Sequence, residues 1–254
     1  MDIGVFIFDT DYSINISELA RELEERGYES LFVPEHTHIP TSRRSPFPGG
    51  GELPKQYSHT LDPFVSLGFA AASTKNLKIG TGICLLPQRD PIVTAKSIAS
   101  LDLMSKGRFV LGLGGGWNVD EMENHGVTYK TRFAMMKEHV LAMKSLWVDE
   151  EAEFHGEYIN FDKSWAYPKP VQKPYPPILM GGETDYTLKR VVDYCDGWFP
   201  RGRGGFDAGE SMQRLKNMAA QSGRDMNTLS VSVFGAPPNE ETINSYKKAG
   251  IDRA

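Results

Sequence analysis

The sequence predicts an α/β protein whose parallel sheet is covered by helices. Short apolar runs rich in β-branched and aromatic residues recur along the chain, and longer stretches with helical spacing separate them. The runs are continuously apolar rather than alternating, which is typical of parallel strands buried on both faces. Right-handed crossovers between such strands give either an open doubly wound sheet or a closed barrel. The expected strands are residues 3–8, 30–33, 77–85, 109–113, 178–180, 197–199 and 229–234.

Helix start and stop signals support this alternation. Apolar residues within 19–23 repeat at helical spacing, and Gly27 is placed to end that helix. Asp-Pro pairs at 62–63 and 90–91 predict the starts of two further helices, because proline suits the first helical turn. The strands stop at seven, since the chain ends at 251–254 where an eighth would begin. We therefore expect the first and seventh strands to be unpaired at their facing edges.

Length and composition are those of an ordinary globular protein. The 254 residues suit a single domain, 40% of them are hydrophobic, and the net charge of −5 argues against a nucleic-acid binder. The first residues lack a basic region and no apolar run approaches about eighteen residues, so we expect a cytoplasmic protein without membrane contact. Cys84 and Cys195 lie far apart and outside any Cys-x-x-Cys pattern, which gives no support for a disulfide framework or a zinc cluster.

Two segments interrupt the alternation of strands and helices. Residues 37–60 are rich in Pro, Gly and Ser and follow the second expected strand, where a barrel carries an active-site loop. We interpret them as a substrate lid. Residues 150–177 include a stretch too dense in proline for a helix, so we expect a β-excursion followed by an extended crossing there.

A glycine cluster at 112–116 closes the fourth expected strand. It fails the spacing of the dinucleotide fingerprint, because Trp117 or Val119 stands where the third glycine belongs. We interpret the cluster as a strand end that a ligand approaches closely.

A second glycine-rich strand end suits a phosphate. Gly181 and Gly182 precede Thr184, which is a plausible cap for the following helix, so free amides and the positive end of a helix dipole meet there. A loop with Arg201, Gly202 and a further arginine follows the next strand. Its arginines either add charge-assisted contacts to the same anion or belong to a solvated loop.

Glu35 and His36 lie at the end of the second strand, the catalytic face of a barrel. The pair His36 and His38 also matches the way a binuclear metal site begins, but no histidine occurs at or beyond the fifth strand, where further ligands would be needed. We therefore expect no metal. An imidazole titrates near neutral pH, which makes His36 a candidate proton donor.

These residues together resemble the bacterial luciferase-like family, and within it the branch that uses the deazaflavin coenzyme F-420. The resemblance covers nearly the whole chain and rests on the order and spacing of several short motifs rather than on any one of them. The motifs are Val33-Pro34-Glu35-His36, Lys78-Ile79-Gly80-Thr81-Gly82-Ile83, Leu101-Asp102 through Ser105, Gly107 and Arg108, Gly112-x-Gly114-x-Gly116-Trp117, Pro168-Lys169-Pro170-Val171-Gln172, Pro177-Ile178 with Gly181-Gly182, and Asp196-Gly197-Trp198.

The resemblance implies a (β/α)₈ TIM barrel with the cofactor across its C-terminal mouth, from which this chain departs by the missing eighth strand. Relatives carry a non-prolyl cis peptide behind the cofactor ring, which would fall here between Gly82 and Ile83. The implied cofactor contacts are Gly82, Ile83, Gly114, Gly115 and Gly116 near the ring, and Gly181, Gly182, Thr184, Arg201 and Gly202 near the phosphate.

The same resemblance suggests catalytic candidates. Glu35 and His36 match an acidic residue and histidine that related deazaflavin enzymes place near the reacting ring carbon. Trp117 stands where some relatives have a catalytic glutamate, so proton transfer falls to His36, with Glu35 orienting it or the cofactor.

Three functions remain open at this point. The first is hydride transfer between F-420 and a small organic substrate, favoured by Arg43, Arg44, Arg201 and Arg203 near the mouth, since the deazaflavin has a long anionic tail. The second is an FMN-dependent monooxygenase, and the third is a catalytically silent barrel that binds flavin or deazaflavin. The family often forms dimers, so we expect a homodimer.

Overall fold

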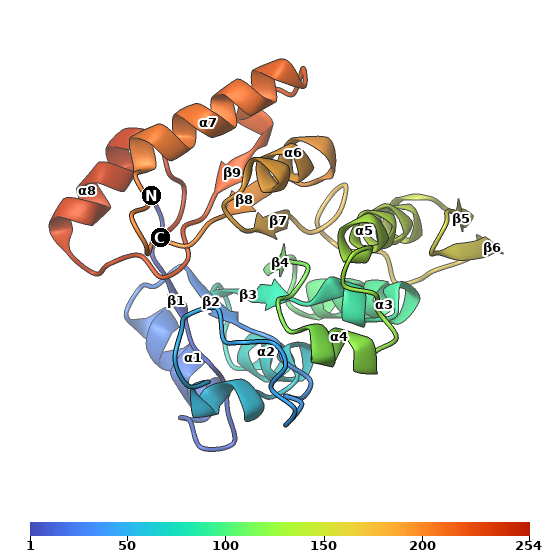
Figure 1. Ribbon diagram of the computed structural model, residues 1–254, viewed down its shortest axis with the longest axis horizontal. Coiled ribbons are helices and arrows are strands. Elements are labelled where there is room, and N and C mark those ends of the chain that lie inside the picture. Colours follow the sequence, from blue (N-terminus) through green and yellow to red (C-terminus); the bar gives the residue numbers. More distant parts are fainter.

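The computed structural model describes residues 1–254, and its centre is a curled sheet of seven parallel strands (Figure 1). All seven expected strands are present, and neighbouring strands pair in parallel in the order β1-β2-β3-β4-β7-β8-β9. The sheet curls around an axis, so the barrel alternative holds and the open sheet does not. The strands are β1 (Gly4–Phe6), β2 (Ser30–Val33), β3 (Lys78–Cys84), β4 (Phe109–Leu113), β7 (Ile178–Gly181), β8 (Gly197–Phe199) and β9 (Ser230–Val231).

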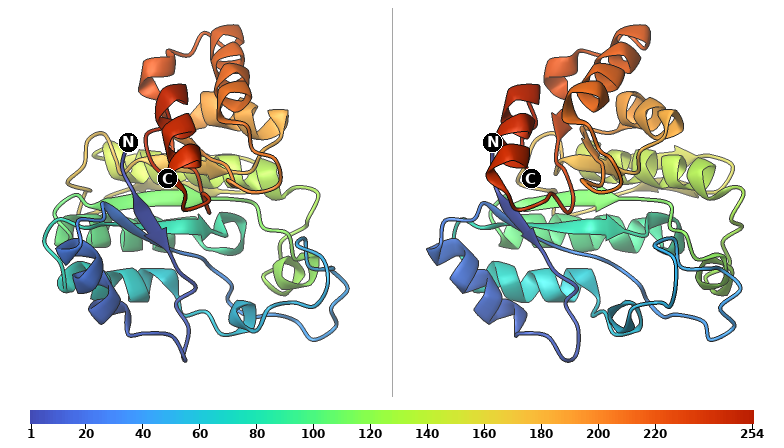
Figure 2. Two further views of the ribbon diagram at one scale, coloured as in Figure 1. Left: turned by 90° about the vertical axis from the view of Figure 1, so that its left-hand side faces the viewer. Right: turned by 60° about the vertical axis from the view of Figure 1, so that its left-hand side comes forward.

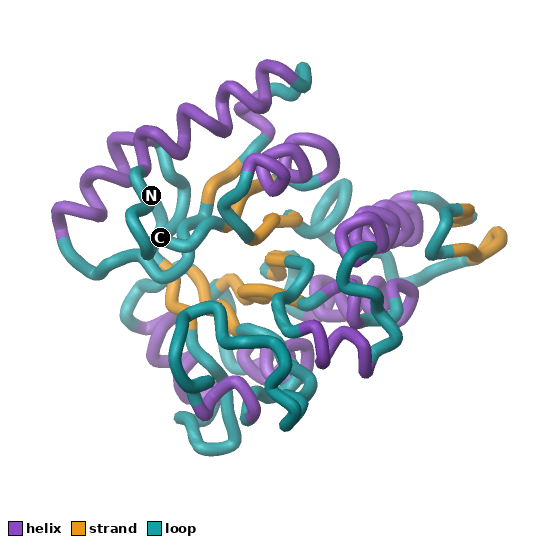
Figure 3. The backbone as a smooth tube through the Cα atoms, viewed as in Figure 1, coloured by secondary structure: helices purple, strands orange, loops and turns teal.

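Helices cover the outer face of this sheet, as Figure 3 shows by colour. Both predicted Asp-Pro starts are confirmed: Asp62 accepts hydrogen bonds from the amides of Phe64 and Val65, and Asp90 accepts one from Val93. A main core of 42 buried residues includes most of the side chains between the sheet and the helices. The helices are α1 (Ile16–Glu25), α2 (Pro63–Ala72), α3 (Pro91–Met104), α4 (Val119–Asn124), α5 (Arg132–Val148), α6 (Asp185–Tyr194), α7 (Ala208–Gln221) and α8 (Glu240–Ala249).

The sheet has no eighth regular strand, as predicted, but its two edges are not left unpaired. The last residues of the chain lie between β1 and β9, and Arg253 forms parallel bridges with both Asp2 and Ser232. Backbone hydrogen bonds join Asp2 N to Asp252 O at 2.7 Å and Val233 N to Arg253 O at 2.8 Å. Figure 2 shows the two ends of the chain side by side at this seam. The expectation of unpaired edges was therefore wrong, because three residues are enough to bridge them.

The two interrupting segments lie outside the sheet. Residues 150–177 contain an antiparallel hairpin of β5 (Ala152–His155) and β6 (Asn160–Ser164), followed by an extended stretch. The loop 37–60 is irregular apart from one short 3₁₀ turn, η1 (Lys55–Ser58). Two further turns of this kind are η2 (Leu86–Gln88) and η3 (Met226–Thr228). No helix is long and apolar enough to span a bilayer.

Candidate active site

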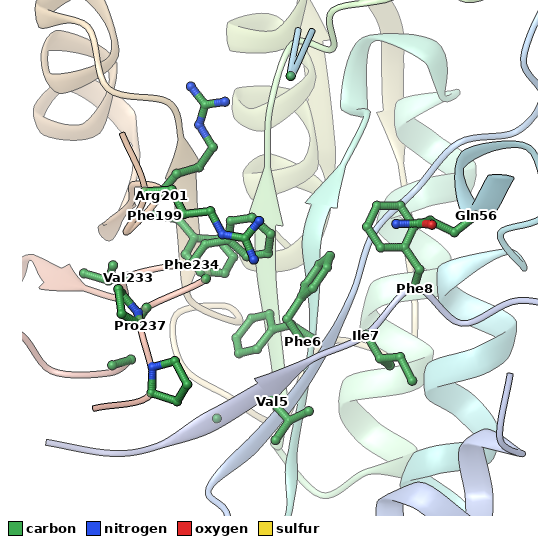
Figure 4. A pocket seen from close by; sticks show the side chains of 18 of the residues that line it. Val5, Phe6, Ile7, Phe8, Gln56, Phe199, Arg201, Val233, Phe234 and Pro237 are labelled. Carbon is green, nitrogen blue, oxygen red and sulfur yellow. The ribbon is translucent and has the colours of Figure 1, made fainter. Parts of the chain in front are cut away.

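A large cavity runs along the inside of the sheet between β1 and β9. Its volume is about 1600 Å³, and it extends from the loops at the C-terminal ends of the strands to Ile3 and Ala254. Aromatic rings make its interior wall, with Phe6 and Phe234 in edge contact at 4.4 Å between ring centres. In Figure 4 the side chain of Phe6 points from β1 toward Phe199 and Phe234. An apolar interior with polar groups at the mouth is the usual form of a small-molecule site.

His36 is held in a fixed orientation beside this mouth. It lies three residues beyond the end of β2, is buried, and its Nδ1 lies 2.7 Å from Oε2 of Glu121. The other oxygen of Glu121 accepts the amide of Thr37 at 3.1 Å, and its side chain is fully buried. Nε2 of His36 makes no hydrogen bond within the protein. A carboxylate on Nδ1 fixes the imidazole and leaves Nε2 free to exchange a proton.

Glu35, which was expected to orient His36 or the cofactor, is engaged by other residues of this chain. Its Oε2 accepts the amide of Leu85 at 2.7 Å, and its Oε1 accepts Nε of Arg89 at 2.5 Å. Both oxygens are therefore engaged by the segment that follows β3. Glu35 does not orient His36, and Glu121 does so instead.

Trp117 belongs to an aromatic cluster that covers His36. The rings of Tyr57 and Trp117 lie 5.3 and 5.8 Å from the imidazole centre, and Phe47 contacts both. Tyr57, Phe47 and Trp117 all line the cavity. Burial raises the pKa of Tyr57, which keeps its phenol protonated. Two of these rings come from the loop 37–60, so that loop encloses His36.

The end of β3, which was expected to lie behind the cofactor ring, contains the cis peptide that the resemblance implied. The peptide bond between Gly82 and Ile83 is cis, as the resemblance suggested, and the pairing of β3 with β4 shifts register just there. The neighbouring cluster has a packing function of its own. A Cβ on Gly114 would collide with Ile83, and one on Gly115 would lie 2.7 Å from the ring of Phe133.

Gly116 adopts a positive φ of 72°, and a Cβ there would lie 2.8 Å from Met122. Close approach of this chain's own side chains thus accounts for the glycines at 114–116, and the cavity wall does not include them. Their contact with a ligand remains a prediction.

Gly182, Thr184 and Thr187 form a small cradle at the start of α6, directly after the glycine pair 181–182. A Cβ on Gly182, whose φ is 118°, would lie 2.8 Å from Oγ1 of Thr187. Thr184 caps α6 by accepting the amide of Thr187, and the two threonine hydroxyls lie 3.1 Å apart. Two hydroxyls beside an uncovered glycine at a helix N-terminus fit a phosphate group. A Cβ on Gly181 would instead meet Ile83 at 3.1 Å.

Arg201 reaches the same place but is already paired. Its Nε and Nη2 donate to the two oxygens of Glu183 at 2.8 and 2.9 Å, and its amide donates to Oε1 at 3.1 Å. Arg201, Arg203 and Glu183 all line the cavity. Gly202 packs against Val233, so it serves the pairing of β8 with β9.

His38 follows Thr37 at the start of the loop 37–60. The hydroxyl of Thr37 lies 2.9 Å from Nδ1 of His38 and 2.7 Å from Nε2 of His125. The structure contains no group of three or more His, Cys, Asp or Glu side chains arranged to hold a metal ion.

Glu121, Tyr57 and Glu183 were not singled out from the sequence. Tyr57 and Glu183 lie within stretches that were, namely the lid and the glycine-pair loop. Glu121 had only a weak signal: it follows Asn118, a cap residue, in an acidic stretch one turn beyond Trp117.

Comparison with known families matches residues 1–244 to the model of luciferase-like monooxygenases. The chain belongs to this family. An uncharacterised relative from Mycobacterium tuberculosis is 42% identical over 229 residues, which are 89% of this chain and 80% of the relative. The F420-dependent hydroxymycolic acid dehydrogenase of the same organism is 29% identical over 175 residues, covering 67% of this chain and 48% of that protein.

Solved structures of luciferase-like proteins share the fold. An F420-dependent secondary alcohol dehydrogenase in complex with an F420-acetone adduct superposes with a TM-score of 0.78 at 19% identity, covering 99% of this chain and 91% of that one. The monooxygenase RslO1 from Streptomyces bottropensis gives 0.76 at 21% identity, over 98% of this chain and 76% of that one. The family thus includes both F420-dependent oxidoreductases and monooxygenases.

Proposed function

We propose that this chain is a cytoplasmic oxidoreductase that transfers a hydride between F-420 and a small organic substrate. The observation that carries the proposal is His36 beside the cavity mouth, with Nδ1 held by Glu121 and Nε2 free. Hydride transfer to or from a carbonyl or alcohol requires a proton to move as well, and this arrangement supplies a positioned proton donor and acceptor. Both cysteines are free and buried, which is consistent with a cytoplasmic location.

The residues present fit a phosphorylated tricyclic cofactor at two places. The shifted register at Gly82 and Ile83 would support the ring, and the cradle of Gly182, Thr184 and Thr187 would hold a phosphate. When bound, a deazaflavin supplies two-electron hydride chemistry and reacts poorly with oxygen.

The chain's own residues would then control water and the proton. Tyr57, Phe47 and Trp117 pack around the imidazole and keep bulk water from it. In the reducing direction, Nε2 of His36 gives a proton to the oxygen of the product. In the oxidising direction, the same nitrogen removes the proton from the hydroxyl group, and the buried carboxylate of Glu121 stabilises the resulting imidazolium.

A binding titration tests the cofactor assignment. We expect F-420 to bind with micromolar or tighter affinity and FMN much more weakly, measured by fluorescence change at constant ionic strength. Equal or reversed affinities would overturn the preference for F-420. A protein that binds F-420 but turns over no alcohol, aldehyde or ketone would be a silent binding barrel.

An FMN-dependent monooxygenase is the second candidate, and one observation favours it. Arg44 is paired with Asp120 and Glu123, and Arg201 is paired with Glu183. Two of the four arginines near the mouth are thus neutralised, which leaves less positive charge for the long anionic tail of F-420. Oxygen consumption with reduced FMN would distinguish this activity.

We also propose a homodimer formed through α2. This helix has no charged residue, and Val65 and Phe69 are 60% and 63% exposed on its outer face. On the adjacent helix α3, Val93 is 64% exposed. An apolar face of this kind requires an apolar partner, and a second copy supplies the same face in a two-fold arrangement.

A further inference from the structure

The arginine expected to hold a phosphate holds a carboxylate of this chain instead. Glu183 follows the glycine pair directly, and both of its oxygens accept hydrogen bonds from the guanidinium of Arg201. A two-point pair of this geometry is also how arginine binds phosphate, so the carboxylate and a phosphate would use the same donors. Glu183 and Arg201 both face the cavity rather than the core.

Two of the arginines around this pair are already engaged by carboxylates, and Arg203, which also lines the cavity, makes no ion pair. Arg214 is also committed, since its Nη2 lies 2.7 Å from Asp185. Burial alone would raise the pKa of Glu183, but the hydrogen bonds and charge of Arg201 outweigh it and lower the pKa. The carboxylate is therefore ionised at neutral pH and repels an incoming phosphate while it occupies the arginine.

The pair is also free to separate. The side chains of Arg201 and Glu183 are 63% and 36% exposed, so either can rotate without opening the core. An ion pair with this much exposure contributes little to stability, which makes its exchange for a phosphate inexpensive. The threonine hydroxyls of the cradle, by contrast, stay in place on the first turn of α6.

We propose that Glu183 is an internal competitor for the phosphate of the cofactor: the phosphate displaces the carboxylate from Arg201, and Glu183 thereby sets the affinity for phosphorylated ligands. This inference rests on the proposed cofactor site at Gly182, Thr184 and Thr187. Ligands that lack a phosphate do not need Arg201, so their affinity is independent of Glu183.

The test is the substitution Glu183→Gln in the full chain, which removes the charge and keeps the shape. FMN and riboflavin differ only by the phosphate, so each is titrated into wild type and variant and followed by flavin fluorescence. We expect the variant to bind FMN about tenfold more tightly and riboflavin with unchanged affinity. Glu210→Gln is the control for net charge, because Glu210 is exposed on the first turn of α7 and makes no ion pair, so its loss frees no arginine.

The outcomes are decisive in each case. Unchanged or weaker FMN binding by Glu183→Gln overturns the proposal that Glu183 competes with phosphate. Glu183 would then serve only to position Arg201. An equal gain with riboflavin or with Glu210→Gln also overturns it, because the effect would then be a general one of charge.

Failure of the proposed function is detected separately, by wild type that binds neither F-420 nor FMN. The two proteins are then compared in inorganic phosphate and in sodium chloride of equal ionic strength, with the unfolding temperature as the readout. If phosphate raises the unfolding temperature of Glu183→Gln more than that of wild type, the result supports the proposal that Glu183 competes with phosphate. An equal response in both proteins overturns it.

Discussion

The seam between β1 and β9 is secured by one ion pair, and its removal has a calculable cost. Arg253 donates from Nε and Nη2 to the two oxygens of Glu29, both at 2.7 Å, and Lys78 contacts the same carboxylate. Burial alone would raise the pKa of Glu29, but the hydrogen bonds and charge of Arg253, helped by Lys78, lower it from 4.5 to about 2. The side chains are only 19% and 14% exposed, so solvent screening is limited.

This depression of the pKa corresponds to about 3 kcal/mol, since one pKa unit is worth about 1.4 kcal/mol. A carboxylate with a lowered pKa stabilises the folded state above its ordinary pKa, and the contribution is lost as the pH falls from about 4.5 toward 2. We therefore expect Glu29→Gln to lower the free energy of unfolding by about 2 to 3 kcal/mol at pH 7. Near pH 3 the difference between the two proteins should shrink by at least about half.

Urea unfolding followed by tryptophan fluorescence at several pH values measures both quantities. Glu22→Gln is the matched control: Glu22 pairs with Arg26 on the surface of α1, where both side chains are largely exposed, and its loss should cost less than about 0.5 kcal/mol. A difference for Glu29→Gln below about 0.5 kcal/mol at pH 7, or one that does not vary with pH, would refute the reasoning.

Four further expectations concern the site and the surface. His36→Ala should lower turnover at least about a hundredfold with less than about a tenfold change in cofactor affinity, because the phosphate cradle is separate; kinetics and titration check it. Glu121→Gln should lower turnover about tenfold or more with unchanged cofactor binding, since the imidazolium loses the negative charge beside it; full activity would make Glu121 structural. Thr187→Val should weaken the binding of FMN about tenfold and leave the affinity for riboflavin unchanged; equal losses of affinity would mean that the phosphate binds elsewhere. Val65→Lys with Phe69→Lys should give a monomer in light scattering, and a persistent dimer would exclude α2 as its interface.

The strands were predictable because each is a continuous apolar run bounded by breaking residues. Residues 30–33 and 109–113 match β2 and β4 residue for residue. β9 is shorter than expected, with only Ser230 and Val231 in regular pairing, because the closing segment bridges rather than extends it. That closure was not predictable from pattern, since three terminal residues have no periodicity to detect. It depends on the long-range pairing of Arg253 with Glu29, which no local signal encodes.

The positions of the candidate residues at the strand ends were predictable, but their hydrogen-bond partners were not. Sequence pattern located the strand ends and the two glycine loops, because parallel strands bring their C-terminal ends together. Sequence pattern did not predict which carboxylate pairs with which cationic side chain. Glu35 was expected to orient its neighbour His36 or the cofactor, yet beyond the end of β2 Glu35 pairs with Arg89 while His36 pairs with Glu121. Arg201 was assigned to a ligand, although it forms an ion pair with Glu183 on the adjacent loop.

Trp117 and Glu121 contact the same imidazole in different ways. The family resemblance implied a catalytic glutamate at this position in some relatives, and Glu35 was the acidic residue expected to orient His36 or the cofactor. In the structure Trp117 packs against the imidazole ring, while Glu121, four residues further on, provides the carboxylate to Nδ1. Trp117 precedes the cap residue Asn118 and Glu121 lies in the first turn of α4, so one short segment brings both side chains to the imidazole. The acidic partner of His36 is therefore Glu121, and Glu121→Gln is a more direct test of the proton-transfer scheme than any change at Trp117.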